Sequence, residues 1–399
     1  MSMELQSCMP LVPSEAAIGK SMLPDKAIDL STSSSRLGGK ISECTRQTII
    51  EHMAVINSYY SNMIEGNPTE PYEIREAQKG NFSSEPAKRD LQEESLAHIQ
   101  VQKWIKSQTL TLDDVFTSEF IKSVHYEFYR HVPESFFDIK NDEGKVIDKV
   151  IPGQWRERSV KVGSHIPPDA TTVDDLMKEF FLSYHPNKFK GEKRIIAAMC
   201  MHHRFTWIHP FIDSNGRVGR LLTDTVLRLL GLESEGIWCL SRGLARNSKE
   251  YKESLANADT KRKGDLDGRG ALSESGLVDF ADFMLTTAID QVSYMDKLLE
   301  LSAVQKRITS YIRDRNSGLV EGYGKIKDGA AVVLFNAFTL GKLDRAYAKQ
   351  LTGEKDTSAK RLLAQLRDEG LLSETSHKSE LFWEIPEHAE KWYFPNLAS

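Results

Sequence analysis

The spacing of apolar residues along the chain predicts that most of it is helical. Between residues 41 and 65, apolar side chains recur at steps of four, three, four and three, so they lie on one face of a helix. The Gly-Asn-Pro sequence at positions 66–68 then ends this helix. The residues of the apolar face are Ile49, Met53, Ile56, Tyr60 and Met63.

A second pair of helices is predicted between residues 194 and 231. Residues 194–208 are largely apolar, and Pro210 ends that segment because proline cannot easily continue a helix. The next helix begins near Gly216 and ends at Gly231. Its apolar face consists of Val218, Leu222, Val226 and Leu229, and its polar face consists of Arg217, Arg220, Asp224 and Arg228.

Two other segments break the helical pattern. Residues 151–168 combine turn residues with a short alternation of apolar and polar side chains, which predicts a β-hairpin. Residues 329–399 show three helices followed by a hairpin, an order similar to that of a winged helix, whose third helix would enter a DNA major groove. The predicted helices are residues 330–340, 345–351 and 358–369, and the predicted strands are residues 371–375 and 380–385.

These patterns predict a mainly α protein with a small hairpin in its core and an α+β domain at its C-terminal end. Residues 1–40 lack periodicity, and we expect a partly flexible arm in which residues 32–40 (TSSSRLGGK) are a flexible link. We expect the helical core to cover residues 41–290 and a connecting helix with a linker to cover residues 291–328. The C-terminal domain then covers residues 329–399.

The composition is that of an ordinary soluble protein, with 27% charged and 40% hydrophobic residues. The cysteines are widely spaced and include no CxxC pair, which favours reduced thiols over disulfides or zinc. No long uninterrupted apolar run occurs, so we expect no membrane span and a cytoplasmic location. The net charge of −5 offers no overall attraction for nucleic acid.

The most informative stretch is residues 209–220 (HPFIDSNGRVGR), at the junction of the second helix pair. The Ser-Asn-Gly turn at 214–216 presents unpaired N–H groups at a helix N-terminus, which is a site for an anion. Arg217 and Arg220 are three residues apart, so their guanidiniums are neighbours that can bind phosphate oxygens in a bidentate manner. The sequence therefore predicts a polyphosphate site.

Two further side chains give this site its chemistry. Asp213 supplies a hard oxygen ligand for the Mg²⁺ that accompanies phosphates. His209 lies at the edge of the turn and can accept a proton near neutral pH. The combination suits a reaction of a nucleoside polyphosphate.

Residues 209–220 resemble the signature of the Fic family, HPFx[D/E]GNGRxxR, at every specified position except Ser214, where the signature has glycine. The approach helix of that family is also similar to the upstream residues Ala198, His202, Phe205 and Ile208. The resemblance implies a protein adenylyltransferase, which transfers AMP from ATP to a hydroxyl of a target protein.

The resemblance also implies a role for each residue of the signature. His209 would deprotonate the target hydroxyl, and Asp213 would hold Mg²⁺ against the α- and β-phosphates. The residues that would bind the phosphates are Ser214, Asn215, Gly216, Arg217 and Arg220. The serine at the glycine position can still offer its N–H group, but its side chain would crowd the nucleotide if the backbone needs a positive φ.

The end of the first predicted helix is similar to the inhibitory motif [S/T]xxxE[G/N] of Fic proteins. Ser61 and Glu65 occupy its specified positions and share one helix face, because they are four residues apart. A carboxylate at the C-terminal end of a helix is unfavourable by up to about 1 kcal/mol unless a cation offsets it. The resemblance implies that Glu65 pairs with Arg220, which the γ-phosphate needs, from an inhibitory helix spanning residues 45–65.

Two less specific sequence features extend the resemblance. The hairpin predicted at 151–168 resembles the flap of Fic proteins, which holds the target segment by main-chain pairing. The residues of the flap that would position the target are Val160, Lys161 and Val162. Asn247 and Tyr251 lie in a segment that borders the adenine and ribose in the family. Simpler interpretations are a surface hairpin, helix capping by Asn247 and core packing by Tyr251.

Three other functions stay open at this point. A metal hydrolase would use ligands from the set His202, His203, His209 and Asp213, but it leaves both arginines unexplained. Removal of AMP from a modified protein would use the same site, with Glu65 orienting water. A nucleotide-sensing DNA-binding regulator would act through the C-terminal domain. DNA binding is not favoured, because acidic residues over 341–399 cancel the basic surplus of residues 342–361.

The implied substrate and cofactor are ATP and Mg²⁺. The implied partner is a target protein with a Tyr, Thr or Ser hydroxyl, and self-modification and a homodimer stay open.

Overall fold

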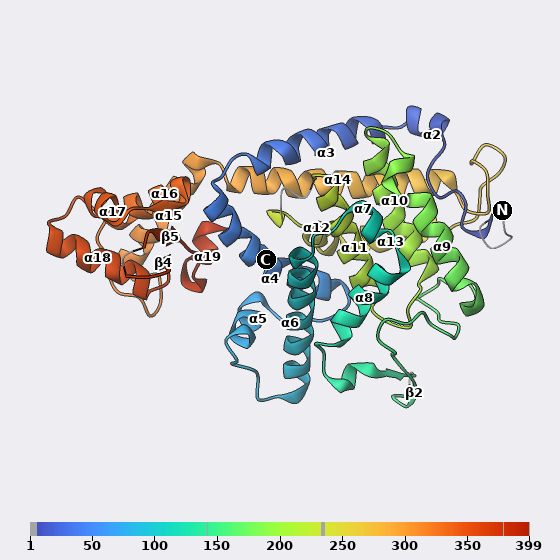
Figure 1. Ribbon diagram of the computed structural model, residues 1–399, viewed down its shortest axis with the longest axis horizontal. Coiled ribbons are helices and arrows are strands. Elements are labelled where there is room, and N and C mark those ends of the chain that lie inside the picture. Colours follow the sequence, from blue (N-terminus) through green and yellow to red (C-terminus); the bar gives the residue numbers. More distant parts are fainter. Residues whose placement is uncertain (1–5, 142, 233–235, 378, 399) are drawn as a thin grey trace. The chain divides into compact units, whose positions relative to one another are not determined.

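The computed structural model describes residues 6–141, 143–232, 236–377 and 379–398 (Figure 1). The chain divides into two compact units. The first unit consists of residues 1–34, 57–234 and 239–291, and the second consists of residues 35–56, 235–238 and 292–399. The structure confirms the expected fold class, since helices dominate and the strands form only small antiparallel sheets.

The first unit holds most of the helices. Helices α3 (Leu23–Gly38), α4 (Glu43–Ile64) and α14 (Glu274–Leu298) run across boundaries between the residue ranges of the two units. The other helices of the first unit are α2 (Glu15–Gly19), α5 (Pro71–Gln78), α6 (Pro86–Ser107), α7 (Leu112–Val115), α8 (Ser118–Tyr129), α9 (Val173–Tyr184), α10 (Lys193–Ile208), α11 (Asn215–Leu229), α12 (Leu240–Arg246) and α13 (Ser248–Ala258). Its strands β1 (Asp138–Lys140) and β2 (Val146–Lys149) form an antiparallel pair.

The predicted helix pair is confirmed as α10 and α11, which pack against each other at the centre of the first unit (Figure 1). Helix α10 is buried on nearly all sides, which explains its almost continuous apolar sequence. Helix α11 ends where predicted, because Gly231 takes a left-handed φ of 78° that residues with a side chain adopt reluctantly. The loop between the two helices therefore starts from two buried, well-packed supports.

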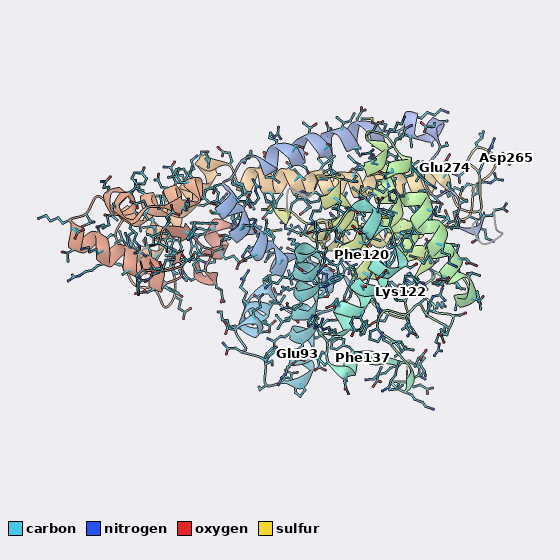
Figure 2. The ribbon with its side chains drawn as sticks, in the orientation of Figure 1. Glu93, Phe120, Lys122, Phe137, Asp265 and Glu274 are labelled. Atoms are coloured by element: carbon cyan, nitrogen blue, oxygen red, sulfur yellow. The ribbon has the colours of Figure 1, made fainter. Side chains whose placement is uncertain are left out.

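Aromatic packing attaches α6 and α8 to this centre. Phe120 of α8, labelled in Figure 2, stacks on Trp104 of α6 with ring centroids 6.3 Å apart. Phe128 and Tyr129, at the other end of α8, are almost completely buried. These contacts fix the two helices whose side chains reach the candidate site.

The second unit contains the elements predicted for the C-terminal part of the chain. Three helices are followed by a hairpin, as expected, and the structure adds a short strand, β3 (Lys342–Leu343). This strand pairs with β5 (Leu381–Trp383), which also pairs with β4 (Leu372–Glu374), so the antiparallel sheet has the order β3-β5-β4. Trp383 packs against Phe338 and Tyr393 in its core. The elements are α15 (Leu301–Asn316), α16 (Gly329–Leu340), β3 (Lys342–Leu343), α17 (Arg345–Leu351), α18 (Asp356–Asp368), β4 (Leu372–Glu374), β5 (Leu381–Trp383) and α19 (Glu387–Tyr393). The winged-helix assignment rests on this element order and stays a prediction.

The expected flexible link at residues 32–40 is wrong, because α3 continues to Gly38. The serine-rich sequence concealed a helix that is held by burial: Leu30 and Leu37 are completely buried, and the Ser34 hydroxyl donates to the carbonyl oxygen of Leu232 at 2.6 Å. Tertiary packing therefore outweighs the weak helix propensity of serine here. Across the part of the chain that the structure describes, no helix has the length and apolar character required to cross a membrane.

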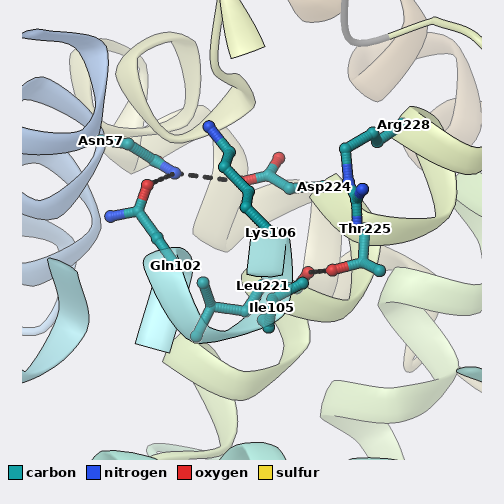
Figure 3. Close-up of a pocket in the computed structure, with 8 residues that line it drawn as sticks. All are labelled: Asn57, Gln102, Ile105, Lys106, Leu221, Asp224, Thr225 and Arg228. Atoms are coloured by element: carbon teal, nitrogen blue, oxygen red, sulfur yellow. Dashed lines mark hydrogen bonds between the residues drawn. The ribbon is translucent and has the colours of Figure 1, made fainter. Parts of the chain in front are cut away.

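A small polar cavity lies between α4, α6 and α11 and contains a half-buried carboxylate, Asp224 (Figure 3). The amide of Asn57 donates to Asp224 and to Gln102, at 3.2 Å in each case. Burial raises the pKa of Asp224 to about 6, although Asn57, Lys106 and Arg220 partly oppose the shift. Asp224 is therefore a carboxylate that the fold stabilises best in its neutral form.

We expect Asp224→Asn to stabilise the protein at neutral pH. Because the folded pKa lies above the unfolded value, the folded state binds more protons and wild-type stability falls as pH rises from about 4 to about 6. The variant lacks this loss, so its gain should be about 3 kcal/mol at pH 7.5 and much smaller at pH 4.5. Urea unfolding at both pH values measures it, with the exposed Asp265→Asn as control. An equal gain at both pH values would refute the assignment.

Candidate functional site

The candidate base, His209, follows the last residue of α10 in a left-handed conformation with φ 52° and ψ 60°. Its Nδ1 atom lies 3.3 Å from the carbonyl oxygen of Thr206, which can only accept a hydrogen bond. The proton therefore resides on Nδ1, and Nε2 is left as a proton acceptor. Burial lowers the pKa of His209 to about 4, with the Arg156 charge adding to the effect and the Thr206 carbonyl opposing it. The imidazole is neutral at pH 7 and available as a base.

The loop after His209 is closed by the side chain of Asn215. Its Oδ1 accepts from the amide of Phe211 at 2.8 Å, and its Nδ2 donates to the carbonyl oxygen of Phe211 at 2.9 Å. This pair of bonds holds the loop in one shape ahead of α11. The sequence resemblance implied that Asn215 binds the phosphates, whereas in the structure its side chain holds the loop.

Ser214, which departs from the signature, occupies a left-handed position with φ 62°. A residue with a side chain costs about 1 kcal/mol there relative to glycine, and the positive φ that the sequence analysis considered for this position is present. The hydroxyl gains contacts in return, because its Oγ lies 3.1 Å from the Tyr129 hydroxyl and accepts from Nη1 of Arg217 at 3.1 Å. The serine is therefore built into a hydrogen-bond network.

Asp213 is held ionised beside this network. The Tyr129 hydroxyl donates to its Oδ2 at 2.7 Å. Burial alone would raise the pKa of Asp213, but the Arg217 charge and the Tyr129 hydrogen bond outweigh burial and keep the pKa below its usual value. Both side-chain hydrogen bonds to this carboxylate, from the Tyr129 and Ser214 hydroxyls, go to Oδ2. The carboxylate is thus charged and has an oxygen available for a hard cation.

Arg217 is buried in a set of contacts that the sequence did not predict. Its Nη2 donates to Oε1 of Glu94, a buried carboxylate on α6, and its Nε donates to Oδ1 of Asn62 at 3.1 Å. Burial alone would lower the pKa of Arg217, but the carboxylates of Glu94, Glu65 and Asp213 hold it above its usual value. The first arginine of the signature is therefore already paired with a carboxylate.

We expect Glu94→Gln to destabilise the fold by about 3 kcal/mol, because it leaves the buried guanidinium of Arg217 without its closest counter-charge. Glu93→Gln is the matched control, since Glu93 precedes Glu94 on α6 and pairs with the exposed Arg89 (Figure 2). That control should change stability by less than about 1 kcal/mol. Urea unfolding at pH 7.5 measures both. Equal effects of the two variants would show that the Glu94 pair contributes nothing particular.

Arg220 makes the contact that the inhibitory motif predicted. Its Nη2 donates to Oε1 of Glu65 at 2.6 Å and to the carbonyl oxygen of Ser61 at 2.9 Å, and its Nε donates to the Ser61 hydroxyl at 2.9 Å. Burial alone would raise the pKa of Glu65, but Arg220 and Arg217 outweigh burial and hold the pKa below its usual value. The pair is therefore ionic.

Glu65 also covers the start of α11. A Cβ atom at Gly216, in the first turn of that helix, would collide with Oε1 of Glu65, so the carboxylate lies directly against this glycine. Helix N-termini attract anions through their free N–H groups and the helix dipole. The Glu65 carboxylate thus lies where an anion such as a phosphate would bind.

A cavity of about 510 Å³ opens beside these groups, a size suited to a small-molecule ligand. Eight of the predicted site residues are not among those lining it: Ser61, Val160, Lys161, Asp213, Ser214, Asn215, Arg217 and Asn247. The Asn247 amide donates to the carbonyl oxygen of Gly243 at the end of α12, which is the capping role considered above. The residues that line the cavity include Glu65, Val162, His165, Trp207, His209, Gly216, Arg220, Tyr251 and Leu255.

Tyr251 lines this cavity and is also part of the buried core. Its hydroxyl lies 2.8 Å from Nε2 of His202, whose Nδ1 lies 2.8 Å from the Thr223 hydroxyl. His203 contacts Asp259 and the carbonyl oxygen of Leu255. Both histidines are fully buried with their nitrogens engaged, and no cluster of potential metal ligands occurs in the described ranges. These observations speak against the metal hydrolase.

The prediction of a β-hairpin at residues 151–168 is wrong. Every residue of this segment is described, and it contains no strand, only an isolated bridge between Val162 and His165. Prolines within the segment lack the N–H group that a strand ladder needs, and the amide of Arg156 donates to the carbonyl oxygen of Pro210. The strands β1 and β2 lie just upstream. Val160 and Lys161 have no strand partner, and Val162 reaches the cavity.

Sequence reasoning missed Glu94 and Tyr129. Glu94 is 123 residues from Arg217, and Tyr129 is 84 residues from Asp213. Neither belongs to a motif, and local periodicity does not show which helices come together in space. Only the tertiary fold could reveal them.

Comparison with known proteins supports the Fic resemblance over part of the chain. Residues 115–227 match the model of the Fic/DOC family. The chain carries a Fic domain. It is 27% identical over 216 residues to a protein adenylyltransferase Fic of Aedes aegypti, a match that covers 52% of this chain and 38% of that protein. A protein of the same name from Culex quinquefasciatus is 28% identical over 216 residues, covering 52% of this chain and 37% of the relative.

Solved structures share the fold. A Fic family protein from Desulfovibrio desulfuricans G20 superposes with a TM-score of 0.51 at 18% identity, covering 90% of this chain and 95% of that one. Fic-1 from C. elegans gives a TM-score of 0.53 at 13% identity, covering 72% of this chain and 76% of that one. The matches therefore establish a Fic domain, while the chain spans well under half the length of the curated relatives it matches.

Proposed function

We propose that this protein is an adenylyltransferase that moves AMP from ATP to a Tyr, Thr or Ser hydroxyl of a target protein or of itself. The observation that carries the proposal is the neutral His209 on a cavity that also exposes Arg220 and the start of α11. A base and an anion site facing one space suit attack on a polyphosphate. Relatives named protein adenylyltransferase support the same activity.

The chemical step follows from this arrangement. The target hydroxyl oxygen attacks the α-phosphorus of ATP, its proton passes to Nε2 of His209, and the bond from that phosphorus to the bridging oxygen breaks to release pyrophosphate. Arg217, Arg220 and the α11 N-terminus would stabilise the charge on the β- and γ-phosphates. The ionised Asp213 fits Mg²⁺, which neutralises phosphate charge when bound and usually takes one or two carboxylates plus phosphate oxygens.

We propose that Glu65 inhibits the reaction. Its carboxylate neutralises Arg220 and covers Gly216, so it occupies two of the groups that the γ-phosphate needs. ATP would still enter, but its phosphates would be misplaced for in-line attack. The segment around Val162 borders the cavity and would position the target from there, with Tyr251 next to the nucleotide.

The test is to incubate the purified Glu65→Gly protein with Mg²⁺ and ATP labelled at the α-phosphate and to follow label transfer to itself and to proteins of a cell extract. Label on protein, with none from ATP labelled at the γ-phosphate, supports AMP transfer. Label from the γ-position alone would mean phosphoryl transfer and would refute the proposal.

A further inference from the structure

Arg156 lies in the segment between β2 and α9 and is buried, with an exposed fraction of 3%. Among the described residues, its guanidinium donates only to main-chain carbonyl oxygens. Nε donates to His209 at 2.8 Å, Nη1 to Arg158 at 3.0 Å, and Nη2 to Pro168 and, at 3.4 Å, to Ile208. One side chain thus joins its own segment to the loop that carries the candidate base.

The charge of Arg156 has no carboxylate within ion-pair distance in the described parts of the chain. Burial lowers the pKa of Arg156, and the charge of Asp169 only partly opposes this. Burying a cation without a paired anion is costly. The fold therefore accepts the cost of burying this cation, whose guanidinium holds main-chain carbonyl groups, among them the carbonyl oxygen of His209 at 2.8 Å from Nε.

The conformation of His209 explains the effect of the hydrogen bonds from Arg156. A left-handed φ disfavours any residue with a side chain by about 1 kcal/mol or more. The Arg156 amide donates to Pro210 at 2.9 Å, so main chain and side chain of one residue hold both peptides that flank this turn. Relaxation of the turn to an ordinary φ would rotate the imidazole away from the cavity.

We propose that Arg156 is the positioning residue for the candidate base: it clamps the His209 peptide in its left-handed turn and so keeps Nε2 directed at the cavity. Arg156 is not among the residues that line the cavity. It acts through His209, and its removal should slow the chemical step without weakening nucleotide binding. The activity test of this inference rests on the proposed function.

The activity test uses the full chain with Glu65→Gly as the active parent. Adding Arg156→Gln should lower kcat roughly 100-fold, the scale of a displacement of about 1 Å at a reacting group, and leave KM for ATP within about threefold. Arg156→Lys should recover only a small part, because an ammonium cannot reach several carbonyls in a planar fork. The control is Arg158→Gln, an exposed neighbour. Unchanged kcat in Arg156→Gln would overturn the inference, and so would an equal loss in the control.

A second readout needs no activity and distinguishes the two failures. In ¹⁵N-histidine NMR spectra of the protein with wild-type Glu65, the His209 ring should show one tautomer, with the proton on Nδ1. Arg156→Gln should convert it to a mixture, and Arg158→Gln should not. If the Glu65→Gly parent transfers nothing, the proposed function fails while the NMR result still decides the role of Arg156. A single unchanged tautomer in Arg156→Gln would overturn the inference.

Discussion

Replacing Glu65 by glycine should raise transfer of AMP by roughly 100-fold. The wild-type carboxylate is paired with Arg220 at 2.6 Å and lies over Gly216, and the variant frees both for the γ-phosphate. The partly buried Glu65–Arg220 ion pair is worth about 3 kcal/mol, and ATP no longer has to displace it in the variant. That energy corresponds to an increase of about two powers of ten in the rate of transfer. Residue 65 follows the last helical residue of α4, so glycine there costs the helix little.

Steady-state transfer from ATP labelled at the α-phosphate measures this gain. Glu51→Ala is the matched control, because Glu51 is an exposed carboxylate on the same helix, and it should leave the rate unchanged. A Glu65→Gly rate equal to wild type would show that Glu65 does not inhibit. A different result, loss of AMP removal from a modified protein, would favour the hydrolytic alternative in which Glu65 orients water.

Replacing His209 by alanine in the Glu65→Gly parent should lower transfer by about a thousandfold, within the range expected for loss of a general base. The ATP affinity should stay within a few-fold, because the phosphates are held by Arg217, Arg220 and the start of α11. Calorimetric titration with ATP separates the two effects. His185→Ala, at a histidine paired with Asp113 outside the cavity lining, is the control.

The same residue sets the pH dependence of the reaction. Because the pKa of His209 is lowered to about 4, the base is unprotonated throughout the neutral range. Transfer by the Glu65→Gly variant should therefore be nearly constant between pH 6 and pH 8 and fall only as pH drops toward the pKa, where the imidazole becomes protonated. A decline centred near pH 6.5 would show that His209 titrates like an unperturbed histidine.

Short-range sequence information was sufficient for the centre of the site. Helix α10 is almost continuously apolar, helix α11 shows clear periodicity, and proline and glycine mark where they end. The Glu65–Arg220 contact was available because both ends lie in motifs, although 155 residues separate them. Ser214 was recognised as a departure, and its positive φ agrees with the glycine that the signature has at that place.

The contacts that set charge and position at the site could not be predicted. Glu94 is one polar residue among many on α6, and its meaning depends on which face α6 presents to Arg217. Arg156 stands in a segment that looked like a hairpin, and its role appears only when its donors are followed to the carbonyl of His209. In α3, burial of leucines outweighed a sequence that local rules assign to a flexible link.

The most direct test of the account is the intact mass of the purified wild-type and Glu65→Gly proteins after incubation with Mg²⁺ and ATP. We predict that Glu65→Gly gains the mass of AMP on a side chain while the wild type stays unmodified or nearly so. Equal masses for the two proteins, with no AMP on any protein of an added cell extract, would contradict an adenylyltransferase inhibited by Glu65.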